Sequence, residues 1–407
     1  MNFKIRDDCR LCFSKDLQTI LELADTPLAN EFVAADNLYQ SQDKFPLYLA
    51  RCRSCGHVQL PVVVDPARLF SSYVYVSGTS QSFVDHFERY AHKVIQTYSL
   101  KPGDLVVEIG SNDGTLLRFF KQAGMQVLGV DPAQEIAKTA TVRGIETICE
   151  FFNGGTAELI KSKYGLAKLV IANNVFAHAD DLHEIAQATK SLLDPLVGHF
   201  IFEVQYLVDL VEDTLFDMVY HEHLSYHSLE PLISFFNILD MRVMDVERVN
   251  THGGSIRVSV STNLSNDNVT PHVSELINFE HQHLTQAAFN SLSQRVEDSA
   301  NGLKSLLNSS TGKVVGYGAP AKLTTLMYQF KLKSTDFAYI VDDSPWKQGL
   351  FTPGLHIPVV SSQQMQEPSN RPDHIVIFAW NFADSIAKKF PEFSGKFIVP
   401  LPVLKEL

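Results

Sequence analysis

The stretch Leu105-Val-Val-Glu-Ile-Gly-Ser-Asn-Asp-Gly-Thr-Leu-Leu117 decides the fold class of this chain. Its first five residues, 105–109, predict a strand that is buried on both faces, as in a parallel sheet covered by helices. A loop with glycines at positions 110 and 114 follows, and an apolar helical pattern begins after it. A strand, a glycine loop and a helix start together present backbone N–H groups to a nucleotide-like ligand.

A second predicted strand, residues 126–130, ends in Asp131. A carboxylate at the end of the second strand of such a unit can accept hydrogen bonds from ribose hydroxyls. The glycine loop and Asp131 together therefore predict a site for an adenosine-type cofactor.

The residues of the loop favour S-adenosylmethionine over a dinucleotide. A dinucleotide fingerprint reads Gly-x-Gly-x-x-Gly, whereas this loop carries an acid before its first glycine. A carboxylate attracts the sulfonium and ammonium of S-adenosylmethionine and repels a pyrophosphate. We therefore expect S-adenosylmethionine to be bound by Glu108, Gly110, Asn112, Gly114 and Asp131. A nicotinamide dinucleotide, or a crevice without any ligand, are the alternatives.

Length, charge and hydropathy narrow the class of protein. A chain of 407 residues is long enough for two or three domains of about 150 residues each. Its net charge of −12 argues against a nucleic-acid partner, which needs a basic surface. There is no apolar run long enough to span a membrane and no signal-peptide core near the N-terminus. We expect a cytoplasmic protein with reduced thiols, either a monomer or a small homo-oligomer.

Four of the five cysteines form two Cys-x-x-Cys pairs, which we call the zinc knuckles: Cys9 with Cys12, and Cys52 with Cys55. This spacing lets both sulfurs of a pair point to one tetrahedral ion. Four thiolates fill the coordination shell, so we expect one structural Zn²⁺ rather than a catalytic one. The 39 residues between the knuckles would hold a small sheet. Two redox pairs, or chance, are the alternatives.

The rest of the chain predicts two α/β units. Strands at 105–109, 126–130, 146–149, 167–172 and 199–204 alternate with helices and predict a parallel sheet with its ligands at the strand ends. Asn173, Asn174 and His178 follow the fourth strand and should line the crevice. Cys149 lies in the third strand and is expected to be buried. We expect a zinc-binding module at 1–70, a Rossmann-like methyltransferase domain with an active-site insert at 71–270, and a helical linker with a second α/β domain at 271–407.

The second unit begins with Lys313-Val-Val-Gly-Tyr-Gly-Ala-Pro-Ala-Lys322, which predicts a strand, a Gly-x-Gly loop and a helix start. Lys322 lies where it would meet a phosphate at the helix N-terminus. A solvated lysine is the alternative. The segment from Asp342 to Gly349 is a polar loop expected over the same crevice.

Tyr220-His-Glu-His223 is the densest polar cluster in the chain. Histidine titrates near neutral pH and can take and return a proton. In an extended segment Tyr220 and Glu222 would share one face, whereas in a turn all four side chains could converge. A His-Glu-x-x-His metal site is excluded by the spacing, and a surface loop with incidental histidines is the alternative.

These motifs, in this order, resemble those of the sugar C-methyltransferases that act on nucleotide-linked 4-keto-deoxysugars. The matching segments are Cys9-x-x-Cys12, Thr26-Pro-Leu-Ala-Asn30, Cys52-x-x-Cys55-Gly56, Glu108–Gly114, Ile171–His178, Tyr220–His223 and Gly316–Lys322.

The resemblance implies methyl transfer to C3 of the sugar through an enolate generated by a base. It implies that His223 is the base and that Tyr220, Glu222 and His178 orient it, hold sugar oxygens or stabilise the enolate. Tyr75 resembles a tyrosine that the family brings to the pocket. Three other functions stay open: an O- or N-methyltransferase, a zinc-ribbon binding module with a vestigial cofactor domain, and a nicotinamide-dependent sugar oxidoreductase.

Overall fold

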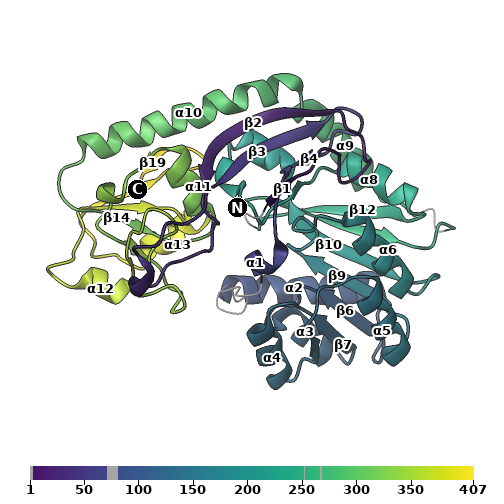
Figure 1. Ribbon diagram of the computed structural model, residues 1–407. Coiled ribbons are helices and arrows are strands. Elements are labelled where there is room, and N and C mark those ends of the chain that lie inside the picture. Colours follow the sequence, from purple (N-terminus) through teal and green to yellow (C-terminus); the bar gives the residue numbers. More distant parts are fainter. Residues whose placement is uncertain (1–2, 71–80, 252, 266–267) are drawn as a thin grey trace.

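The computed structural model describes residues 3–70, 81–251, 253–265 and 268–407. Figure 1 shows a middle α/β part (blue to teal) beside a C-terminal α/β part (green to yellow), with two long N-terminal strands (purple) above and between them. The long helix α10 (Gln286–Ser309) runs over these strands from one part toward the other. The predicted fold class, two α/β units with a small β-rich cysteine module, is confirmed.

The middle part is built on a seven-stranded sheet in the order β12-β13-β10-β9-β6-β7-β8. Strands β6 to β10 are parallel, and β13 and β12 extend the sheet antiparallel. The chain leaves β6 toward one edge through β7 and β8, then crosses to β9 and β10 on the other side. Ligands of such sheets bind at a reversal of this kind, which here lies beyond the carboxyl ends of β6 and β9. The strands are β6 (Leu105–Ile109), β7 (Gln126–Val130), β8 (Thr147–Ile148), β9 (Leu169–Asn173), β10 (His199–Gln205), β12 (Arg242–Val249) and β13 (Ser255–Ser261).

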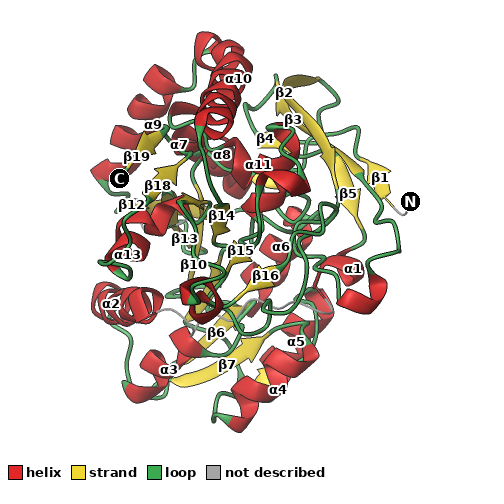
Figure 2. Cartoon of the chain, turned by 90° about the vertical axis from the view of Figure 1, so that its left-hand side faces the viewer, coloured by secondary structure: helices red, strands yellow, loops and turns green. Residues whose placement is uncertain are grey.

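Helices cover both faces of this sheet (Figure 2). Alternate residues of β6 pack into different cores: Val106 lies with side chains of α2, α3 and α4, and Val107 with side chains of α5, α6 and α8. Burial on both faces explains why 105–109 is nearly all apolar. The helices are α2 (Gln81–Thr97), α3 (Thr115–Gln122), α4 (Gln134–Val142), α5 (Gly154–Tyr164), α6 (Leu182–Leu192), α7 (Leu207–Glu212), α8 (Leu229–Ile238) and α9 (Pro271–His283).

The N-terminal part contains a two-stranded sheet, β1-β5, and a four-stranded sheet in the order β11-β4-β3-β2. The edge strand β11 (Ser225–Tyr226) comes from the insert after β10 and pairs antiparallel with β4. The segment that carries Tyr220 to His223 therefore runs directly into the sheet whose strand β3 ends at Cys52. The other elements are β1 (Phe3–Ile5), β2 (Leu17–Thr26), η1 (Ala35–Asn37), β3 (Phe45–Cys52), β4 (Val58–Gln59), β5 (Val62–Val64) and α1 (Pro66–Phe70).

The C-terminal part has a six-stranded sheet in the order β16-β15-β14-β17-β18-β19, parallel except for β19. Helix α11 (Lys322–Gln329) contacts β2 and the 3-10 turn η3 (Phe216–Met218). One apolar core consequently joins all three parts of the molecule. The remaining elements are β14 (Val314–Tyr317), η4 (Ser334–Asp336), β15 (Ile340–Val341), β16 (Val359–Val360), α12 (Ser362–Gln366), β17 (His374–Ile377), η5 (Trp380–Phe382), α13 (Ala383–Lys388), β18 (Lys396–Val399) and β19 (Lys405–Glu406).

Most expected strands are present within two residues of their predicted bounds, and the expected helical linker after residue 270 consists of two helices, α9 and α10. The expectation for Cys149 is wrong: β8 ends at Ile148, and the thiol is exposed at the edge of the sheet. Among the helices within the described ranges, none is long and apolar enough to cross a membrane.

Candidate active site

The cofactor loop between β6 and α3 has the backbone that its glycines predict. Gly110, Asn112 and Gly114 all have positive φ, at 64°, 50° and 75°. A Cβ on Gly110 would overlap the side chain of Val175, so this position needs both the space and the freedom of glycine. The loop turns sharply at the end of β6, and α3 starts directly after Gly114.

Asp131 follows β7 and braces this loop. Its Oδ2 accepts a hydrogen bond from the backbone N–H of Asn112 at 2.9 Å, and its Oδ1 accepts one from Ala133 at 2.9 Å. Each carboxylate oxygen keeps a lone pair for a further donor. Burial raises the pKa of Asp131, whereas these two backbone hydrogen bonds lower it. The carboxylate lies where the sequence predicted a ribose partner.

Several buried polar atoms at this edge of the sheet have no hydrogen-bond partner among the described residues. They are Oε2 of Glu108, Oγ of Ser111, and both side-chain amide atoms of Asn173 and Gln205. They belong to the carboxyl ends of β6, β9 and β10, which are neighbours in the sheet. Buried polar groups are normally paired, so this set fits a polar ligand.

The charge at this edge favours a cation. Glu108 is 4% exposed, and burial together with Asp113 and Asp131 raises its pKa well above the usual value. A cationic ligand would relieve this repulsion. S-adenosylmethionine has the ammonium, sulfonium and ribose hydroxyls that suit Glu108, the loop and Asp131.

Tyr220, His223 and His178 come together. The backbone N–H of His223 donates to the carbonyl of Tyr220 at 2.9 Å, so the segment is a turn rather than a strand. The Tyr220 hydroxyl lies 2.8 Å from Nε2 of His223, and the ring centroids of His178 and His223 are 4.9 Å apart. His178 is brought there by the loop after β9.

The surroundings of His223 define its neutral tautomer. Its Nδ1 lies 2.9 Å from the carbonyl oxygen of Met218. Since a carbonyl only accepts, Nδ1 carries the proton and Nε2 carries the lone pair. The Tyr220 hydroxyl therefore donates to Nε2. This arrangement presents an oriented imidazole base beside a phenol.

The other two members of the turn point elsewhere. His221 is 1% exposed, and its Nε2 donates to the carbonyl of Pro46 at 3.0 Å. Glu222 is buried, and its Oε1 accepts a hydrogen bond from Nδ2 of Asn30 at 2.7 Å. Burial raises the pKa of Glu222 to about 7, although Asn30 and Lys347 lower it. The structure therefore shows neither Tyr220 and Glu222 on one face nor all four side chains together. Instead, the turn brings Tyr220 to His223 and directs His221 and Glu222 elsewhere.

Two further residues expected at the site are Asn174 and Tyr75. Asn174 has positive φ (54°) and donates its backbone N–H to the carbonyl of Glu203 at 2.7 Å, which joins the ends of β9 and β10. Tyr75 lies outside the described residues, so its place near the pocket stays a prediction.

Lys322 lies at the start of α11, but its side chain is only 7% exposed. Its ammonium lies 3.6 Å over the ring of Trp380 and donates to Oδ1 of Asn381 at 2.8 Å. Burial lowers the pKa of Lys322 to about 8, and the nearby Asp217 opposes this shift. The solvated-lysine alternative is wrong. A phosphate would have to use the remaining N–H groups of a buried ammonium.

The four knuckle cysteines converge. Their sulfur atoms lie within 4.8 Å of one another, and the Cys9–Cys55 and Cys12–Cys52 pairs are each 3.6 Å apart. A tetrahedral zinc with Zn–S bonds of about 2.3 Å needs sulfur separations of about 3.8 Å. Cys9 and Cys52 are fully buried. The donor set fits a closed, structural Zn²⁺ site.

Three site residues were missed from the sequence. Gln205 directly follows the predicted fifth strand, and the strand-end rule that selected Asn173 would have found it. Asn30, the partner of Glu222, ends the quoted Thr26–Asn30 motif. Asp217 interrupts an apolar run, is fully buried and accepts a hydrogen bond from Nε1 of Trp380 at 2.7 Å. A charge inside an apolar run is the signal that marks it.

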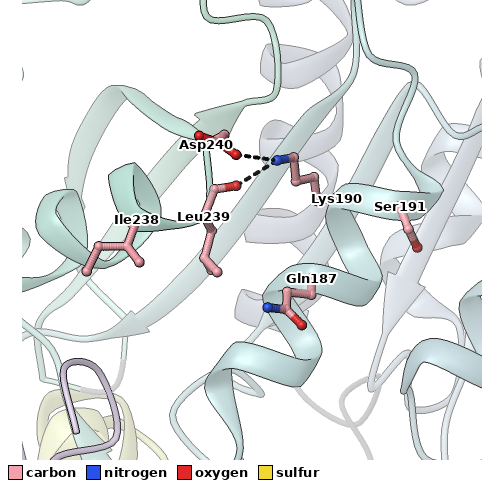
Figure 3. A pocket seen from close by; sticks show the side chains of 6 residues that line it. All are labelled: Gln187, Lys190, Ser191, Ile238, Leu239 and Asp240. Carbon is pink, nitrogen blue, oxygen red and sulfur yellow. Dashed lines mark hydrogen bonds and ion pairs between the residues drawn. The ribbon is translucent and has the colours of Figure 1, made fainter.

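A surface hollow between α6 and the end of α8 is unrelated to these residues (Figure 3). Its Lys190 points to the last turn of α8, where it donates to the carbonyl of Leu239 at 2.8 Å and lies 3.4 Å from Asp240. A lysine at this position stabilises the C-terminus of the helix. The hollow therefore has a structural explanation.

Family models match successive parts of the chain. A zinc binding domain matches residues 9–70, a methyltransferase domain matches 83–243, and a C-methyltransferase C-terminal domain matches 250–402. The C-methyltransferase NovU of Streptomyces niveus is 36% identical over 404 residues, which cover 97% of this chain and 96% of NovU.

Two solved methyltransferase structures each resemble less than half of the chain. Magnesium protoporphyrin IX methyltransferase (ChlM) of Synechocystis PCC 6803 is 15% identical with a TM-score of 0.35, and covers 44% of this chain and 81% of its own. An S-adenosylmethionine-dependent methyltransferase of Clostridium acetobutylicum is 13% identical with a TM-score of 0.36, and covers 44% and 92%. At such scores these two resemblances carry no argument about function.

Proposed function

The chain belongs to the C-methyltransferase family, as an S-adenosylmethionine-dependent enzyme with a structural zinc, and from this premise we propose that it methylates C3 of a nucleotide-linked 4-keto-deoxysugar. The observation that carries the proposal is the oriented pair of Tyr220 and His223 beside His178. A carbon nucleophile requires a base, whereas a hydroxyl or amine acceptor already carries a lone pair.

S-adenosylmethionine supplies an electrophilic methyl group when it is bound. Glu108, Asn173 and Gln205 offer the unpaired polar atoms that would hold its charged and polar groups. Asp131 offers its free lone pairs to the ribose. The acidic edge of the sheet thus keeps a cationic cofactor at the crevice.

His223 is the proposed general base. The C3–H bond lies α to the C4 ketone, so the electron pair it releases moves onto the C4 oxygen as the proton leaves. The lone pair on Nε2 accepts that proton, and the Met218 carbonyl stabilises the imidazolium through Nδ1–H. Deprotonated C3 then has the electron density to accept a methyl group.

Tyr220 is the proposed partner of the developing negative charge. Its hydroxyl donates to Nε2 in this structure. Substrate entry would free that hydroxyl to donate to the C4 oxygen while Nε2 takes the C3 proton. His178 lies close enough to His223 to hold a neighbouring sugar oxygen. Such preoriented donors act most strongly where charge develops in the transition state.

The nucleotide half of the substrate is proposed to bind at the C-terminal Gly-x-Gly loop. Gly318 has a φ of 90°, and a Cβ there would lie 2.6 Å from Cβ of Ala379. Lys322 and Lys347 both lie at this loop, and Nζ of Lys347 donates to the Ala319 carbonyl at 2.9 Å. Positive charge and a close-approach glycine suit a diphosphate.

Solvent exchange at C3 tests the base directly. In deuterated water without S-adenosylmethionine, the wild-type protein should exchange the C3 hydrogen of a nucleotide-linked 4-keto-deoxysugar. His223→Ala should slow this exchange by roughly 10²- to 10⁴-fold, because it removes the proton acceptor. Its affinity for S-adenosylmethionine, measured by calorimetry, should stay within about threefold of wild type.

His92→Ala is the matched control, because His92 is exposed on α2. It should exchange C3 at the wild-type rate. Exchange by His223→Ala at the wild-type rate would remove His223 from the role of base.

A further inference from the structure

Each zinc knuckle has an arginine directly after its first cysteine, but the two arginines have different surroundings. The sequences are Cys9-Arg10-Leu-Cys12 and Cys52-Arg53-Ser-Cys55. The side chain of Arg53 is 59% exposed and lies 3.8 Å from Asp16, whereas the side chain of Arg10 is fully buried. Burying a guanidinium is costly unless it is well paired, so the partners of Arg10 indicate its role.

Arg10 reaches out of the knuckle toward the active site. Its Nη1 donates to the carbonyl oxygens of Leu60 at 2.9 Å and of Leu224 at 3.1 Å. Its Nη2 forms an ion pair with Oδ1 of Asp180 at 3.1 Å. Leu224 directly follows His223, and Asp180 lies two residues after His178. One guanidinium therefore contacts both loops that carry the active-site histidines.

Asp180 pairs with two further cations. Besides Arg10, its carboxylate pairs with Nζ of Lys4 at 2.8 Å and with Nη1 of Arg6 at 3.2 Å. Arg6 also donates to the backbone carbonyl of Asp180 at 2.8 Å. Three cations from the start of the chain hold the loop after His178 against the zinc module.

Backbone hydrogen bonds complete the connection. The Ala177 carbonyl, directly before His178, accepts from the N–H groups of both Leu224 and Ser225, at 2.9 and 3.0 Å. The Leu224 carbonyl also accepts from the N–H of Leu60 at 3.0 Å. The two histidine loops are thus bonded to each other and to the zinc module around one point, at which Arg10 supplies the side-chain donors.

We propose that Arg10 is a positioning residue, through which the zinc-bound first knuckle sets the spacing of His178 and His223. The planar fork of arginine can serve a carbonyl and a carboxylate at once, which the single ammonium of lysine cannot do in the same geometry. Displacement of a catalytic group by about 1 Å can cost roughly a hundredfold in rate. This inference rests on the proposed roles of the two histidines.

The test compares Arg10→Lys with Arg53→Lys, since each keeps its charge and changes one knuckle at the same position. Both variants should retain one zinc per chain and bind S-adenosylmethionine with wild-type stoichiometry. Arg10→Lys should lower kcat roughly 10- to 100-fold, with KM for S-adenosylmethionine within about threefold of wild type. Arg53→Lys should match wild type in every measurement.

NMR of the histidine rings tests whether Arg10 positions them, independently of the reaction that the enzyme catalyses. With histidine labelled at Cε1, the NMR signals of His178 and His223, assigned through His178→Gln and His223→Gln, should shift in Arg10→Lys and stay in place in Arg53→Lys. If they shift while the wild-type protein fails to methylate a keto-sugar, the proposed function fails and the positioning role stands.

Two results would overturn the proposal. One is wild-type signals and wild-type kcat in Arg10→Lys. The other is loss of zinc or of S-adenosylmethionine stoichiometry in Arg10→Lys in proportion to its loss of activity, because Arg10 would then only stabilise the fold.

Discussion

Two glycine loops in this chain, one in each α/β part, are built alike. The N–H of Gly110 donates to the carbonyl of Val130 at 2.7 Å, and the N–H of Gly318 donates to that of Val341 at 2.7 Å. Both glycines have positive φ, at 64° and 90°. In each part the loop follows the first strand and is tied to the end of the second.

The acid after the second strand is also repeated. Asp131 accepts from the backbone N–H groups of Asn112 and Ala133, at 2.9 Å each. Asp342 accepts from those of Ala319 and Ser344, at 2.7 and 2.8 Å. The polar loop expected at 342–349 thus begins with a residue that holds the same position as Asp131.

The two loops differ in charge. Around the first lie three buried acids, Glu108, Asp113 and Asp131, and burial together with the two aspartates raises the pKa of Glu108. Around the second lie Lys322 and Lys347, while Asp343 is paired with Lys389. The same loop backbone therefore suits a cationic cofactor in one part and, as we propose, a diphosphate in the other. Side-chain charge, rather than backbone shape, distinguishes the two ligands.

Replacing either glycine by alanine should weaken ligand binding at its own loop and leave binding at the other loop unchanged. Gly110→Ala introduces a Cβ that overlaps Val175 at a positive φ. Backbone strain and overlap together cost on the order of 4 kcal/mol. We expect the free loop to relax out of this geometry, so that S-adenosylmethionine must restore it on binding and loses up to roughly a thousandfold in affinity. Gly318→Ala should do the same to the nucleotide-sugar. Calorimetry with each ligand checks both variants, and equal losses for both ligands in either variant would mean that the sites are not separate.

The next effect concerns Glu222, which lies between the two parts and is influenced by Lys347. Its folded-state pKa of about 7 lies above the unfolded value, so the folded protein binds more protons than the unfolded one between about pH 4.5 and 7. Stability from this group is therefore lost as pH rises through that window. Glu222→Gln keeps the acceptor for Asn30 and removes the buried charge.

Glu222→Gln should accordingly be more stable than wild type at pH 8 by as much as about 3 kcal/mol, and close to wild type near pH 4.5. The melting temperatures of both proteins across this range measure the difference. A constant difference between them at all pH values would mean that Glu222 does not titrate in the window.

A smaller effect is expected from the two matched aspartates. Asp131→Asn should weaken S-adenosylmethionine, and Asp342→Asn the nucleotide-sugar, each by about 2 kcal/mol, which is the scale of a hydrogen bond to a charged group. Cross-measurement of both variants with both ligands sharpens the comparison. If Asp342→Asn leaves nucleotide-sugar affinity intact, the likeness of the two loops is only architectural.

Salt should produce the smallest change. A diphosphate held by lysines loses affinity as ionic strength rises, although the burial of Lys322 limits screening. We expect KM for the nucleotide-sugar to rise about threefold between 0.05 and 0.5 M salt, while KM for S-adenosylmethionine changes less. A larger salt effect on the cofactor would reverse the assignment of the two loops.

The parts of the site that could be predicted are those defined by residues close together in sequence. The knuckles and the loop from Glu108 to Gly114 were predictable, because spacing along a few residues defines them. The geometry of Tyr220 and His223 was not, because an extended segment and a turn place the same four residues on different sides. The choice was made by contacts far away in sequence, such as Asn30 with Glu222. Arg10 and Asp180 are likewise distant in sequence, so only the fold shows that they meet.

The position of the transferred methyl group is the most direct test of methylation at C3. The protein should be incubated with a nucleotide-linked 4-keto-deoxysugar and S-adenosylmethionine labelled with ¹³C in its methyl group, and the product examined by NMR. Methylation at C3 predicts methyl protons with long-range couplings to C3 and to the C4 carbon of the ketone. If C3 of the substrate carries a single hydrogen, the product should have none at that carbon. A methyl group bonded to oxygen or nitrogen would contradict methylation at C3.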